Sequence, residues 1–225
     1  PPEQFRAPRP AVLFIHGLAC SAESFRHVFD RDYFPGRSLI LPDLPGFGRS
    51  GKPEDFSYSM EDQALLLEAL LAEFPGQALH VVAHSMGGAV ALLFSPALLS
   101  RVQSFACLEG NLVASDCGLL SRGIAATAFA EYAARTYPRQ REEFQDHAEL
   151  RFGETTPFAV HRSARSLVQW SDSGRLLERF GGTVTVRATT RPIPPDFLRC
   201  RQDLEAVHLT WGNWIAYDRV FILRD

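Results

Sequence analysis

Residues 79–94 read LHVVAHSMGGAVALLF and carry the strongest structural signal in this 225-residue chain. Residues 79–83 form an apolar run that is typical of a buried strand, and a small-residue helix is expected from Gly87 onward. Between the two lies Ser85, with the small residues Ala83 and Gly87 two positions before and after it. Small residues there let the chain reverse sharply and present the serine hydroxyl on a strained nucleophile elbow. The positive end of the following helix favours negative charge that develops at Ser85.

Further strands and helices are expected around this segment. Short apolar runs predict three more strands, buried on both faces, at residues 11–16, 38–42 and 102–108. A Leu/Ala-rich helix is expected over residues 60–74, because Ser59 is suited to cap its first turn. Strands that alternate with helices at this rhythm imply right-handed βαβ units. The expected fold class is therefore α/β, with a mostly parallel sheet and helices on both faces.

The domain organisation follows from where this alternation stops. In residues 111–180 the strand pattern gives way to Ala, Arg, Glu and aromatic residues at helical spacing, which predicts a helical insertion. Residues 181–188 (GGTVTVRA) predict a return to the sheet. The expected order is an N-terminal part of a core over residues 1–110, the insertion, and a C-terminal part of the core over residues 181–225.

A second loop is expected to lie beside Ser85. His16, Gly17 and Leu18 follow the first predicted strand, and a loop there can aim a backbone N–H at the same point as the N–H of Met86. Two such donors form an oxyanion hole. His16 itself is a possible base, but its place beside a glycine at a strand end fits a structural role better.

Three motifs occur together in a characteristic order and spacing. They are His16-Gly17, the turn at residues 43–50 (DLPGFGRS) and the elbow at residues 83–88 (AHSMGG). In these motifs, and through residues 12–111 as a whole, the chain resembles the α/β-hydrolases.

The resemblance implies a fold, a chemistry and several residue roles. It implies the α/β-hydrolase fold, acyl transfer through Ser85, and the backbone N–H groups of Leu18 and Met86 as oxyanion donors. It gives Asp43 a structural role in its turn and no catalytic one. The insertion at residues 111–180 is similar in place and character to the helical cap with which such enzymes shape an acyl pocket.

A serine nucleophile needs a neighbouring base, which in this fold lies downstream of the serine and of the acid. Of the seven histidines, His208 alone follows the predicted returning strand, so it is the expected base. Its context, VHLTWG at residues 207–212, lacks the Gly-His pair and the following helix usual in the family. The tail from Thr183 onward departs from the family pattern, which indicates a divergent or an altered C-terminal end.

Two residues are candidates for the acid that orients the base. Glu109 ends the fourth predicted strand, where some family members place this carboxylate. Asp196 follows the next predicted strand, which is the commoner location, but it precedes His208 by only twelve residues. We favour Glu109, because a carboxylate at the C-terminal edge of a parallel sheet lies on the ligand-binding side.

Charge and composition indicate which binding partners, cellular location and cofactors to expect. The net charge of −3 argues against a nucleic-acid or anionic-membrane partner, which would show a basic face. The chain has no apolar run near the ~18 residues that span a bilayer, and residues 1–10 lack the apolar core of a signal peptide. Four scattered cysteines without a CxxC pair are typical of a reducing compartment, namely Cys20, Cys107, Cys117 and Cys200. We therefore expect a cytoplasmic protein without metal or other cofactor.

The leading functional hypothesis is a serine hydrolase that cleaves a small hydrophobic ester, or less readily an amide, through an acyl-Ser85 intermediate. Carbon–carbon-bond hydrolysis and aminopeptidase-like activity stay open on the same scaffold. A third hypothesis is a hydrolase-fold binding protein or an inactive variant that lacks a complete triad. The sequence leaves the oligomeric state open.

Overall fold

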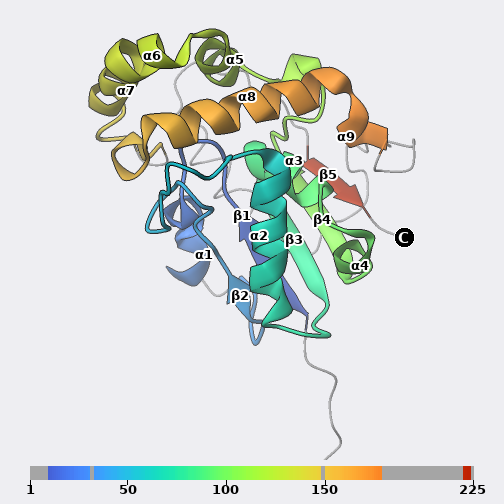
Figure 1. The fold of residues 1–225 in the computed structure, drawn as a ribbon. Helices are drawn as coiled ribbons and strands as arrows, with labels where there is room; N and C mark the ends of the chain where they lie inside the picture. The colour runs from blue at the N-terminus through green and yellow to red at the C-terminus, as the bar shows by residue number, and fades with distance from the viewer. Residues whose placement is uncertain (1–9, 31–32, 148–149, 179–219, 224–225) are drawn as a thin grey trace, which may run out of the picture.

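A mostly parallel β-sheet forms the centre of the molecule (Figure 1). The computed structural model describes residues 10–30, 33–147, 150–178 and 220–223. Within these residues the sheet has five strands in the order β2-β1-β3-β4-β5. The strands are β1 (Ala11–Ile15), β2 (Leu39–Ile40), β3 (Leu79–His84), β4 (Val102–Leu108) and β5 (Val220–Leu223). The pairs β1–β2, β1–β3 and β3–β4 are parallel, and β5 pairs antiparallel with β4.

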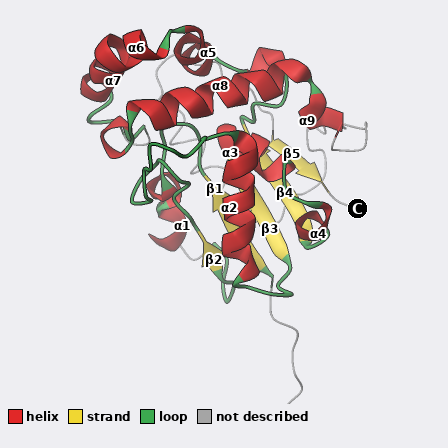
Figure 2. Ribbon diagram, in the orientation of Figure 1, coloured by secondary structure: helices red, strands yellow, loops and turns green. Residues whose placement is uncertain are grey.

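The helices lie in layers on the two faces of the sheet and across one of its ends (Figure 2). Those of the first part of the chain are α1 (His27–Asp30), α2 (Met60–Ala72), α3 (Met86–Leu92) and α4 (Pro96–Leu99). Those of the later part are α5 (Leu119–Ala126), α6 (Phe129–Glu131), α7 (Tyr137–Glu143), α8 (Pro157–Ser173) and α9 (Arg175–Glu178).

Alternation along β1 divides the core into two clusters. All five β1 residues are buried, and successive side chains point to opposite faces of the sheet. Leu13 and Ile15 belong to the large cluster that also contains the buried faces of α2 and α3. Val12 and Phe14 belong to the smaller cluster on the other face. Covered on both faces, the strand needs a continuous apolar run, which is why the pattern of parallel strands is visible in the sequence.

Helix α2 has a defined start and end. The Ser59 side chain caps its N-terminus by accepting a hydrogen bond from the Asp62 N–H. The helix ends at Ala72, two residues before the predicted end. Arg101 lies against this end, where its guanidinium donates to the carbonyls of Leu71 and Phe74. A cation on the last carbonyls of a helix satisfies them and complements the helix dipole.

Helix α8 lies across the carboxyl end of the parallel strands, with α5, α6 and α7 on its outer side (Figure 1). Polar side chains of α8 hold it to the core. Ser163 Oγ donates to Tyr58 O at 3.3 Å, and Ser166 Oγ accepts from the Met60 N–H at 3.0 Å. Arg162 donates to two further core carbonyls, those of Glu54 and Phe56.

The predicted strands and helices of the N-terminal half are confirmed, with boundaries that differ by at most two residues. Helices α5 to α9 occupy much of residues 111–180, where the sequence predicted helix. The strand predicted over residues 181–188 lies outside the described residues. At the C-terminal end, β5 extends the sheet in the antiparallel direction.

Candidate active site

Ser85 lies in a strained turn between β3 and α3. Its φ and ψ angles are 50° and −118°, a positive φ that costs a non-glycine residue about 1–3 kcal/mol. The Ser85 N–H donates to Leu108 O at 2.8 Å, and the Ser85 carbonyl accepts from the Gly88 N–H at 2.9 Å. These bonds hold the strained conformation from both sides, so the nucleophile elbow predicted from the sequence is present.

The elbow depends on a very close approach of α3 to the end of β1. A Cβ atom at Gly87 would lie 2.4 Å from Ile15 O, which is closer than real Cβ atoms come. The loop after β1 then passes directly beside Ser85, since a Cβ at Gly17 would lie 3.2 Å from Ser85 Cβ. Glycine at these two positions lets the elbow and this loop touch through their backbones.

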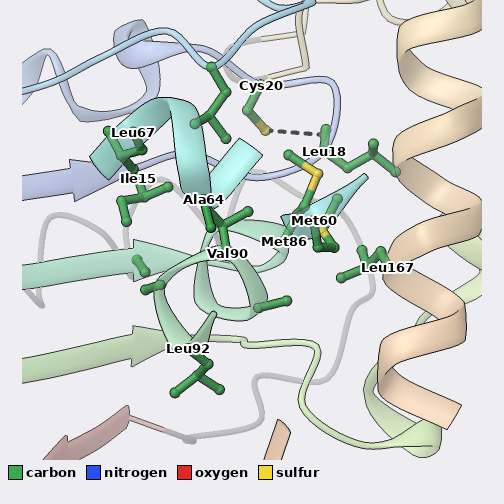
Figure 3. Close-up of a cluster of buried hydrophobic side chains, with 14 of the residues drawn as sticks. Ile15, Leu18, Cys20, Met60, Ala64, Leu67, Met86, Val90, Leu92 and Leu167 are labelled. Carbon is green, nitrogen blue, oxygen red and sulfur yellow. Dashed lines mark hydrogen bonds between the residues drawn. The ribbon is translucent and has the colours of Figure 1, made fainter. Parts of the chain in front are cut away.

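Leu18 and Met86, the predicted oxyanion donors, lie on this contact. Met86 is the first residue of α3, and N–H groups in the first turn of a helix have no partner within the helix. Both side chains are buried in one apolar cluster, which fixes the backbone that carries them (Figure 3). The Leu18 carbonyl accepts a hydrogen bond from Cys20 Sγ at 3.6 Å.

A segment later in the chain also holds this loop. The Arg151 N–H donates to Ala19 O at 2.6 Å, and Ala19 has a positive φ of 57°. A non-glycine residue in this conformation needs support from its surroundings. The hydrogen bond from Arg151 supplies it, so the residue after Leu18 is held by a segment far along the chain.

His16 is fully buried and has a structural role, as expected. Its Nε2 atom accepts from the Leu44 N–H at 2.9 Å and therefore carries no proton. The proton is then on Nδ1, which donates to Gly17 O at 2.8 Å. Burial lowers the pKa of His16 to about 4, so the ring is neutral near pH 7. With both nitrogens engaged, His16 does not serve as the base for Ser85.

Asp43 organises the turn that follows β2. Its two carboxylate oxygens accept from the backbone N–H groups of Ala22, at 2.7 Å, and Arg49, at 2.8 Å. The Ser50 hydroxyl donates to the Asp43 carbonyl at 2.6 Å. These bonds agree with the structural role that the family resemblance implies for Asp43.

Glu109 follows β4 at the same edge of the sheet as Ser85. His84 pairs with Leu108 across the two strands, so the next residues, Ser85 and Glu109, are neighbours. Glu109 has a φ of 48° and a half-exposed side chain. Its carboxylate lies 3.9 Å from Nε2 of the His84 ring. The structure thus places the predicted acid next to the elbow, beside a histidine of the elbow itself.

Asn111 makes the contact with Ser85 that was not predicted. The Ser85 hydroxyl donates to Asn111 Oδ1 at 2.8 Å, and Asn111 is 5% exposed. The sequence assigns a candidate role to Glu109 in this turn but none to Asn111. Asn111 lies three residues after the end of β4, and no sequence motif marks a buried amide at this place. Its contact with Ser85 is therefore visible only in the folded turn.

Behind the elbow, three residues from three elements pack with almost no free space. A Cβ at Gly88 would lie 2.5 Å from Cys107 Sγ, and one at Gly110 would lie 2.1 Å from the same sulfur. Burial raises the pKa of Cys107 to about 12, so its thiol is protonated and unreactive. Cys107 therefore serves as a packing residue.

The other two predicted residues, His208 and Asp196, lie outside the described residues. In the described part of the chain there is no group of three or more His, Cys, Asp or Glu side chains arranged to hold a metal ion. The described helices also include none that is long and apolar enough to span a membrane.

Comparison with known proteins gives the same fold. Lipase 3 of Moraxella sp. is 34% identical over 94 residues, which cover 41% of this chain and 29% of the relative. The uncharacterized hydrolase YugF of Bacillus subtilis is 35% identical over 116 residues, which cover 49% of this chain and 41% of the relative. The matches therefore span less than half of the length of these relatives.

A solved hydrolase from Oleispira antarctica has a similar structure. The TM-score is 0.57 at 20% identity, with 76% of this chain and 69% of that chain covered. At this identity the likeness concerns the fold. Residues 10–170 match the family described as "alpha/beta hydrolase fold", which is most of the chain. The elbow, the loop after β1 and the sheet order described above agree with this match. The chain therefore belongs to the α/β-hydrolase family.

Proposed function

We propose that this protein is a serine hydrolase that cleaves a carboxylic ester, or less readily an amide, through an acyl-Ser85 intermediate. The observation that carries the proposal is the position of Ser85. Its hydroxyl is presented on a strained turn at the N-terminus of α3, directly beside the Gly17–Leu18 loop. Acyl transfer requires a nucleophile and, close to it, backbone N–H groups that can donate to the oxyanion.

The proposed reaction has two halves. A base removes the Ser85 proton while Oγ bonds to the carbonyl carbon, and the N–H groups of Leu18 and Met86 stabilise the oxyanion. The carbon–oxygen bond then breaks, and the alcohol leaves with the proton from the base. Water, deprotonated by the same base, attacks the acyl-enzyme, releases the acid and restores the Ser85 hydroxyl.

We assign the base to His208 and the acid to Glu109. His208 is chosen by its place in the chain, after the serine and the acid. Glu109 is supported by its position directly after β4, next to Ser85, and by a half-exposed carboxylate that another side chain can reach. Asp196 is the alternative acid.

Two observations support an ester with an apolar acyl group. One of the relatives described above is named a lipase, and lipases act on esters. The side chains of Leu18, Met86 and Leu167 belong to one apolar cluster, which joins the loop after β1, the elbow helix and the cap helix (Figure 3).

The test is covalent labelling of the full chain with a fluorophosphonate, followed by peptide mapping. We expect the adduct on Ser85, no labelling of the Ser85→Ala protein, and labelling of Ser100→Ala, an exposed control, at the parent rate. Labelling and p-nitrophenyl ester hydrolysis should fall by about 10³-fold or more in His208→Ala, as for loss of a triad base.

Each contrary result has a defined meaning. An unlabelled Ser85 in folded parent protein rules out the acyl-enzyme proposal and favours a binding protein on a hydrolase fold. Full labelling of His208→Ala removes His208 from the mechanism while leaving Ser85 as the nucleophile. Hydrolysis of aminoacyl arylamides in preference to esters would reassign the substrate class.

A further inference from the structure

We propose that Asn111 is a positioning residue that holds the Ser85 hydroxyl in a resting orientation and competes with the base for its proton. The inference rests on the proposed serine-hydrolase function and extends it to a residue without an assigned role. It begins from the 2.8 Å hydrogen bond that Ser85 Oγ donates to Asn111 Oδ1.

Asn111 and the base compete because the Ser85 hydroxyl can donate only one hydrogen bond. A serine hydroxyl has one proton to donate. While this proton points to Asn111, it does not point to a general base. An amide oxygen accepts a hydrogen bond but is far too weak a base to take the proton near neutral pH. The bond to Asn111 must therefore break before Ser85 can be deprotonated.

The orientation of the Asn111 amide is set by its other partner. Asn111 Nδ2 donates to the backbone carbonyl of Asp116 at 2.7 Å. A flipped amide would place Oδ1 against this carbonyl, with two acceptors facing each other. The oxygen is thus directed to Ser85. The Asp116 carboxylate accepts from the N–H groups of Leu112 and Val113, both at 3.1 Å, which holds the turn in place.

A second bond connects Asn111 to the helix that covers the site. Ser171 Oγ, on α8, donates to the Asn111 backbone carbonyl at 2.9 Å. Both Ser171 and Asn111 are buried. The position of α8 is therefore transmitted through Asn111 to the nucleophile, and a shift of α8 away from the core would loosen the resting orientation of Ser85.

The test compares rates of fluorophosphonate inactivation in the parent and in two variants. Asn111→Ala removes the acceptor, and we expect inactivation about two- to tenfold faster, the factor that corresponds to one neutral hydrogen bond. Asn111→Asp loses the Nδ2 donor to Asp116 O but gives Ser85 a charged acceptor of similar size, and we expect slower inactivation than in the parent because charge-assisted bonds are stronger. The change should lie in the limiting rate, with the half-saturating probe concentration unchanged.

A residue with only a structural role would give lower rates in both variants. Thermal unfolding of each variant checks folding. Ser171→Ala leaves the Asn111 side chain intact and should raise the inactivation rate by less than Asn111→Ala does. If Asn111→Ala does not fold, Ser171→Ala is the variant that tests the proposal. The matched control is Ser173→Ala, which changes an exposed serine of the same helix and should have the parent rate.

The outcomes separate this inference from the function on which it rests. If the parent is not labelled at Ser85, the proposed function fails. If the parent is labelled, but folded Asn111→Ala is no faster or Asn111→Asp is no slower, the competition between Asn111 and the base is overturned and the serine-hydrolase function stands.

Discussion

At position 16, burial decides the protonation state of a histidine in the loop that passes beside Ser85. The pKa of His16 is lowered to about 4 from an ordinary value of 6.5. Between these values the unfolded chain binds a proton that the folded chain does not, so the free energy of unfolding falls as the pH is lowered through this window. The full effect of this one group is about 3 kcal/mol.

We therefore expect His16→Asn to lack this part of the pH dependence. Asparagine keeps a donor for Gly17 O but does not bind a proton. Urea unfolding between about pH 7 and pH 4 measures the slope. The slope should be smaller in His16→Asn than in the parent. Equal slopes in the two proteins would show that His16 does not titrate as burial predicts.

Residues differ in how far their roles could be predicted from the sequence. Ser85 and His16 lie in short motifs whose local spacing carries the signal. The contact of Asn111 with Ser85 depends on the register of two strands and on the shape of one turn, so no local spacing encodes it. For the same reason the pairing of Glu109 with His84 was not predicted, although Glu109 itself was.

On the scale of elements, the close contact of α3 with the end of β1 supports the site. We expect Gly87→Ala to destabilise the protein by about 1–3 kcal/mol, because the new methyl group meets Ile15 O and the two elements must separate. Ester hydrolysis should fall more than stability alone explains, since the elbow and the Leu18 loop move apart. Urea unfolding and kcat measurements check both parts.

The control is the same substitution where space is open. Gly123 lies in α5, and apart from its chain neighbours and the adjacent backbone of its own helix nothing lies within 4 Å of the position of an added Cβ. Gly123→Ala should stabilise the protein by about 0.5–1 kcal/mol, the difference in helix propensity. If both variants had similar stability, the close approach at Gly87 would have no energetic importance.

Elements were predictable where burial gives a simple period. Parallel strands covered on both faces produce continuous apolar runs, so β1, β3 and β4 are visible in the sequence. The antiparallel addition of β5 was not predicted, because strand direction depends on long-range pairing and not on composition.

For the molecule as a whole, Arg162 is a main polar link between α8 and the segment that precedes α2. Its guanidinium donates to the carbonyls of Glu54 and Phe56 and lies 5.6 Å from the centre of the Phe158 ring. We expect Arg162→Ala to destabilise the protein by about 1–3 kcal/mol. Amide hydrogen exchange should rise mainly in α5 to α8, with the central strands little changed.

Arg165→Ala is the matched control, since Arg165 is an exposed arginine on the same helix. It should leave hydrogen exchange and stability near the parent values. Faster exchange in the strands of Arg162→Ala, equal to that in the cap helices, would mean that cap and core unfold as one unit.

The packing around Cys107 has a consequence for how this site can evolve or be redesigned. Gly88, Cys107 and Gly110 come from a helix, a strand and a turn, yet they share one small volume behind the Ser85 elbow. A larger residue at either glycine is tolerated only when the sulfur is exchanged for a smaller group. Related sequences should therefore vary at these three positions together, and a library that aims to reshape the site needs to mutate them as a set.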